Sequence, residues 1–73
     1  MSWNYRIMKR EISENEFEFG IYEVYYNENG KINGWTEESI VPVVDNKEGL
    51  KSEVVEMLKA FNSETILYTR ENK

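Results

Sequence analysis

One segment of this chain, from Phe17 to Tyr26, constrains the fold more than any other. Aromatic and β-branched side chains recur in it at the period of two that is typical of a β-strand. The apolar phase changes near Gly20, so one apolar set lies on each face of the expected strand. The two sets are Phe17, Phe19 and Ile21, and then Tyr22, Val24 and Tyr26. Either a bulge at Gly20 or cover on both faces explains the change, and we favour cover on both faces.

The turn Asn27-Glu28-Asn29-Gly30 follows this strand and predicts an antiparallel hairpin. Asn-Gly tolerates the positive φ angles of a type I′ turn, whose twist suits antiparallel strands. A polar break over residues 13–16 separates the long strand from an earlier alternating segment, and weaker strand patterns follow the turn and the helix. The predicted strands cover residues 3–12, 17–27, 31–36 and 65–69.

An amphipathic helix over residues 46–61 is the clearest prediction. Asp45 is a suitable N-cap, and Glu48 three residues later completes a pattern that resembles a capping box. The apolar side chains that follow recur at helical spacing and form one stripe. They are Leu50, Val54, Met57, Leu58 and Phe61.

This order of elements, β-β-β-α-β, predicts one α+β domain over residues 1–73. We expect a three- to four-stranded, mainly antiparallel sheet with the helix packed on one face. A right-handed crossover through the helix would place the last strand beside the first, in the spatial order 3-2-1-4, and a position beside the third strand is the alternative. The face under the helix would carry Trp3, Tyr5, Phe17, Phe19 and Ile21.

The composition argues against most catalytic chemistry. The chain has 73 residues with no cysteine and no histidine, so it lacks the commonest metal ligands and the usual general base. Glu37 and Glu38 fit a solvated acidic surface better than an acid–base pair, and the run from Asn27 to Gly34 lacks oxygen ligands where a calcium loop needs them. We therefore expect no enzyme, no metal, no cofactor and no small-molecule ligand.

The net charge and the hydropathy of the chain argue against some classes of binding partner. The net charge of −5 disfavours binding to the phosphates of nucleic acid. No segment is apolar enough for a signal peptide or a membrane span, so we expect a cytoplasmic protein that does not enter membranes. Self-association or binding to another protein is the class of function that remains.

Surplus aromatic surface indicates where such binding would occur. One helix covers only one face of the expected sheet, which leaves the second face open in a single chain. Exposed tyrosine and arginine side chains together are typical of interfaces. The candidate interaction surface consists of Tyr22, Val24, Tyr26, Arg6 and Arg10. The alternatives are a solvated face with tyrosine hydroxyls in water, a homodimer contact, and a site for a different protein.

Three stretches resemble a group of short bacterial proteins. They are Trp3-Asn4-Tyr5-Arg6, Glu23 to Gly30, and Gly34-Trp35-Thr36-Glu37. The resemblance covers most of the chain and implies the strand-turn-strand layout, but no activity. A fainter likeness, in layout alone, is to HicB-type antitoxin domains, in which an amphipathic helix similarly follows three strands.

The favoured function is therefore a non-catalytic protein-interaction module or a homodimer. An antitoxin-like role is one alternative, because of the HicB-type layout. An acidic inhibitor that mimics nucleic acid is another, because residues 11–28 carry six acidic side chains and no basic ones.

Overall fold

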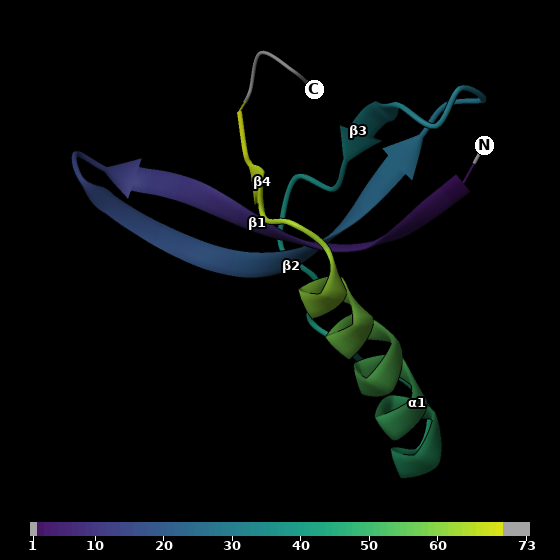
Figure 1. The fold of residues 1–73 in the computed structure, drawn as a ribbon. Helices are drawn as coiled ribbons and strands as arrows, with labels where there is room; N and C mark the ends of the chain where they lie inside the picture. The colour runs from purple at the N-terminus through teal and green to yellow at the C-terminus, as the bar shows by residue number, and fades with distance from the viewer. Residues whose placement is uncertain (1, 70–73) are drawn as a thin grey trace.

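The computed structural model describes residues 2–69, which form a curled four-stranded sheet and one helix (Figure 1). The elements are β1 (Ser2–Ser13), β2 (Glu16–Tyr26), β3 (Ile32–Trp35), α1 (Lys47–Leu58), the 3-10 helix η1 (Lys59–Asn62) and β4 (Ile66–Leu67). The strands lie in the order β3-β2-β1-β4. Neighbours are antiparallel except β1 and β4, which are parallel. The predicted α+β fold and the predicted strand order are both confirmed.

The long hairpin of β1 and β2 forms the centre of the sheet. Met8 pairs with Gly20 in regular register, so there is no bulge at Gly20, and the register shifts only between Glu11 and Ser13 near the turn. A Cβ atom at Gly20 would lie 3.1 Å from the Cβ of Ser39, because the chain after β3 crosses β2 closely at this point. The absence of a side chain at Gly20 therefore makes room for this crossing.

The core lies on the face of the sheet that we expected to be open. Met8, Tyr22 and Val24 point to this face and are buried. Trp35 at the end of β3 and Tyr68 just after β4 close over them, with ring centroids 5.7 Å apart. Residues at the two edges of the sheet therefore cover this face, which the sequence pattern had left without a covering element.

The turn between β2 and β3 differs from the type I′ turn that we predicted. The N–H of Gly30 donates to the carbonyl of Asn27 over 3.0 Å, and only Gly30 in this turn has a positive φ, of 79°. A type I′ turn needs positive φ at both central residues. Here the side-chain oxygen of Asn27 accepts hydrogen bonds from the N–H groups of Asn29 and Lys31 instead, at 2.9 and 3.1 Å.

Helix α1 begins one residue later than predicted, at Lys47 instead of residue 46. The side-chain oxygen of Asn46 accepts a hydrogen bond from the N–H of Gly49 over 2.7 Å, so Asn46 is the N-cap and the prediction of Asp45 is wrong. The helix meets β1 mainly at its C-terminal end and through η1, and its N-terminal half projects away from the sheet (Figure 1).

The apolar side of α1 does not face the sheet. The side that approaches β1 carries Glu53, Met57 and the small residue Ala60, and of the predicted stripe only Met57 is buried. The rest of the stripe is rotated outward, and the prediction that it packs on the sheet is wrong. We call these four exposed residues the helix stripe: Leu50, Val54, Leu58 and Phe61.

Candidate interaction surface

Two of the predicted interaction residues, Tyr22 and Val24, lie in the interior, and the other three are partly buried. Tyr22 is 2% exposed and Val24 is fully buried, so the prediction that they stand on an open face is wrong. Tyr68 packs on Tyr22 at 5.6 Å between ring centroids, and the guanidinium of Arg10 lies 4.7 Å from the centre of the Tyr68 ring. A partner could reach Tyr22 or Val24 only by displacing Trp35 and Tyr68.

Arg6 and Tyr26, the other two predicted residues, are half-buried and bonded within the chain. One guanidinium nitrogen of Arg6 donates to the Tyr26 hydroxyl oxygen over 3.0 Å, and another donates to the carbonyl of Glu64 over 2.7 Å. The Tyr26 hydroxyl donates in turn to the side-chain oxygen of Asn4 over 2.7 Å. These contacts tie β1 to β2 and to the segment before β4, which is a structural role.

Exposed apolar side chains gather instead on the side of the sheet that faces α1. The helix stripe is the first part of this surface, with Leu58 57% and Phe61 65% exposed. The second part is the outer half of the β1–β2 hairpin, residues 9–19, which we call the hairpin arm. Phe17 and Phe19 project from the arm and are exposed, and the ammonium of Lys9 lies 4.2 Å from the centre of the Phe17 ring.

A groove joins the two parts. It has a volume of about 450 Å³ and lies between the arm and the end of α1. Its apolar lining consists of Ile7, Phe19, Ile21 and Phe61. Because Phe61 belongs to both the groove and the helix stripe, the apolar surface is continuous from the arm to the outer end of α1. We call this lining the apolar groove.

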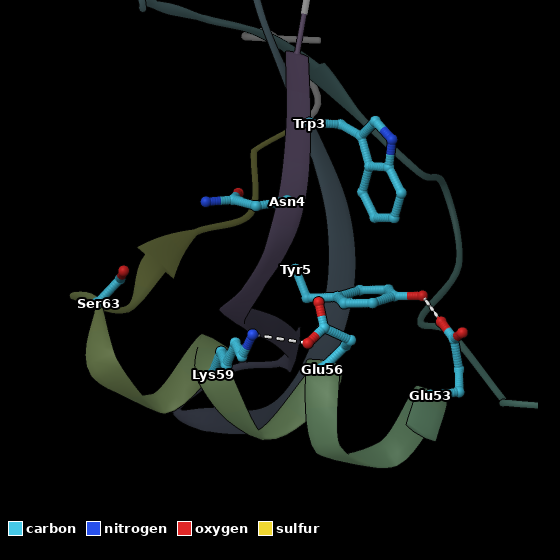
Figure 2. A pocket seen from close by; sticks show the side chains of 7 residues that line it. All are labelled: Trp3, Asn4, Tyr5, Glu53, Glu56, Lys59 and Ser63. Atoms are coloured by element: carbon cyan, nitrogen blue, oxygen red, sulfur yellow. Dashed lines mark hydrogen bonds and ion pairs between the residues drawn. The ribbon is translucent and has the colours of Figure 1, made fainter. Parts of the chain in front are cut away.

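A second, more polar pocket lies where α1 meets the start of β1 (Figure 2). The rings of Trp3 and Tyr5 pack edge to face, with centroids 5.2 Å apart. The Tyr5 hydroxyl donates to a carboxylate oxygen of Glu53, and the carboxylate of Glu56 forms an ion pair with Lys59 at 2.6 Å. Each carboxylate therefore has a partner within the chain.

The hydrogen bond to Glu53 also changes the acidity of Tyr5. This bond, followed by burial and the nearby negative charges, raises the pKa of Tyr5 from 10.0 to about 12. The phenol therefore stays protonated well into the alkaline range. Its role in this pocket is to hold α1 against β1.

The acidic side chains of the hairpin are spread over both faces of the sheet. Glu11 and Glu23 fall on the face toward α1, whereas Glu16 and Glu18 fall on the other. An acidic mimic of nucleic acid needs its carboxylates on one surface, and this arrangement does not provide that.

Within residues 2–69, no group of three or more acidic side chains is placed to hold a metal ion. No helix in this part of the chain is long and apolar enough to cross a lipid bilayer. Comparisons of the chain with family models, with curated proteins and with solved structures find no match. The resemblance to short bacterial proteins stays a prediction.

Proposed function

We propose that this protein is a non-catalytic interaction module that acts by forming a homodimer. The observation that carries the proposal is the outward rotation of the helix stripe. An amphipathic helix gains stability by burying its apolar side against another element. Here Leu50, Val54, Leu58 and Phe61 are 38–65% exposed to water. Complete burial of a leucine or phenylalanine side chain contributes roughly 1.5–3 kcal/mol.

The location of the surface supports binding over catalysis. The helix stripe and the apolar groove carry no titratable side chain, and the carboxylates of the polar pocket are paired within the chain. A contiguous apolar surface that spans separate elements is typical of a protein–protein contact. The antitoxin-like role and the cytoplasmic location stay predictions.

Sedimentation equilibrium from low to high micromolar concentration tests the proposal. We expect the mass to rise toward twice the 8.7 kDa of one chain as the concentration increases. A mass of one chain at every concentration would contradict it.

A pair of matched variants tests whether dimer formation depends on the helix stripe. Leu58→Glu places a charge in the helix stripe, whereas Ser52→Glu places the same charge on the opposite, exposed side of α1. We expect Leu58→Glu to weaken dimer formation by about a hundredfold, since burying an unpaired charge costs several kcal/mol, and Ser52→Glu to leave it nearly unchanged.

A further inference from the structure

We propose that the two copies pack reciprocally, with the helix stripe of each copy seated in the apolar groove of the other and beside its hairpin arm. This inference rests on the proposed homodimer and specifies its contact surface. The same chain supplies both halves of the contact, as a two-fold symmetric interface requires.

The exposed area of the chain matches what such a contact would bury. The chain exposes 5710 Å². A compact monomer of 8.7 kDa is expected to expose about 4,700 Å². The excess of about 1,000 Å² is close to the roughly 800 Å² that each partner buries in a standard interface.

The shape of the chain leads to the same conclusion. Its radius of gyration is 13.2 Å, whereas a compact domain of 73 residues has one of about 11 Å. The hairpin arm and α1 diverge from the centre of the sheet, so that an open angle lies between them (Figure 1). The apolar groove lies between the arm and the C-terminal end of α1.

Both diverging elements are marginal without further cover. Helix α1 has 12 residues, and isolated helices of this length are barely stable in water. Residues 11–19 of the hairpin arm are all exposed, and a two-stranded ribbon alone is marginal as well. Packing the helix of one copy on the arm of another supplies cover to both elements.

The direction of the helix stripe makes the reciprocal packing possible. The stripe begins at Phe61 in the apolar groove and runs outward along α1 to Leu50. When two α1 helices lie antiparallel about a two-fold axis, the outer end of each stripe reaches the groove of the other copy. Leu50 of one copy then lies near Phe19 of the second copy.

Charged side chains flank both of these surfaces. Lys47 and Lys51 flank the outer half of the stripe on α1 and are exposed. Glu11 shares the face of Phe17 on the arm, and Glu14 lies at its tip. Antiparallel helices bring the lysines of one copy toward the arm of the other, where Glu11 and Glu14 lie nearer the tip and Lys9 lies against Phe17 and Phe19.

Disulfide cross-linking between two single-cysteine variants tests the packing, because the chain has no cysteine of its own. Phe19→Cys is mixed with Leu50→Cys and oxidised, and the formation of the mixed disulfide is followed by mass spectrometry of the intact cross-linked chains, which separates it from the disulfides between identical variants. The matched control mixes Phe19→Cys with Ser52→Cys, which lies at the same end of α1 but on its opposite side. All three positions are exposed, and sedimentation of each variant is recorded alongside.

We expect the Phe19–Leu50 pair to cross-link at least about tenfold faster than the control pair, because packing raises the effective concentration of the two thiols. Dimeric sedimentation with equal cross-linking of both pairs would overturn the reciprocal packing and leave the homodimer standing. Monomeric sedimentation of the native chain would overturn both.

Discussion

The hydroxyl of Tyr5 in β1 donates a hydrogen bond to the carboxylate of Glu53 in α1 (Figure 2). This contact joins α1 to β1 on the side of the helix that carries Met57 and Ala60. With Glu53 directed at β1, Met57 and Ala60 follow on the same side and become buried. The helix stripe lies on a neighbouring side of α1 and stays exposed.

Removing this hydrogen bond should loosen α1. We expect Tyr5→Phe to lower the free energy of unfolding by about 1 kcal/mol, since the acceptor is charged but the site is partly open to water. Urea unfolding followed by circular dichroism measures the change. The control is Tyr25→Phe, which removes a 2.8 Å hydrogen bond to Glu23 within the same strand and should cost less. Equal losses in the two variants would contradict this role of Tyr5.

The same contact predicts a pH dependence at alkaline pH. The pKa of Tyr5 is raised from 10.0 to about 12 in the folded chain, mainly by the hydrogen bond to Glu53. The protonated phenol is the form favoured by folding, so its contribution to stability is complete below pH 10 and is lost as the pH rises through 12. Ultraviolet titration of phenolate should contain a step near pH 12 that Tyr5→Phe removes. A step that persists in Tyr5→Phe would show that another group is responsible.

The buried face of the sheet makes a direct prediction for Met8. This side chain has no exposed surface and packs in the cluster that contains Trp35 and Tyr68. We expect Met8→Ala to lower the free energy of unfolding by about 3 kcal/mol. Val43→Ala, at an exposed position in the loop before α1, should change it by less than about 0.5 kcal/mol. If Met8→Ala and Val43→Ala both had similarly small effects on stability, the face of the sheet that carries Met8 would be open to water. The alternating sequence pattern of the strands had suggested such an open face.

The strands and their order were predictable because their signals are local. The period of two in residues 17–26 and the turn residues after it specify a hairpin, and the handedness of the crossover then places β4 beside β1. The choice of buried face was not predictable in this way. Both faces of β2 carry apolar side chains, so Phe17 and Tyr22 give equivalent patterns although one is exposed and the other is buried.

The decisive core residues lie outside any periodic pattern. Trp35 ends a four-residue strand, and Tyr68 follows a two-residue strand, so neither belongs to an alternation long enough to assign a face. The helix stripe, in contrast, lies within a clear periodic pattern. Its spacing was read correctly, but helical spacing is the same whether the sheet of its own chain or a second copy covers it. Three-dimensional packing alone distinguishes these cases.

The helix cap offers a test of the corrected N-terminus. We expect Asn46→Ala to lower the free energy of unfolding by about 1 kcal/mol, because the N–H of Gly49 loses its acceptor. Asp45→Ala should cost clearly less, since Asp45 precedes the cap. Thermal unfolding compares the stability of the two variants. A larger loss of stability in Asp45→Ala than in Asn46→Ala would show that Asp45 is the N-cap, as predicted from the sequence.

Amide hydrogen exchange of α1 as a function of protein concentration tests the central claim, that a second copy covers the helix stripe. If a second copy does so, exchange between Leu50 and Leu58 slows several-fold from low to high micromolar concentration, because association stabilises the helix. Leu58→Glu should remove this dependence on concentration. Exchange rates in α1 that are the same at every concentration of the native chain would contradict the account.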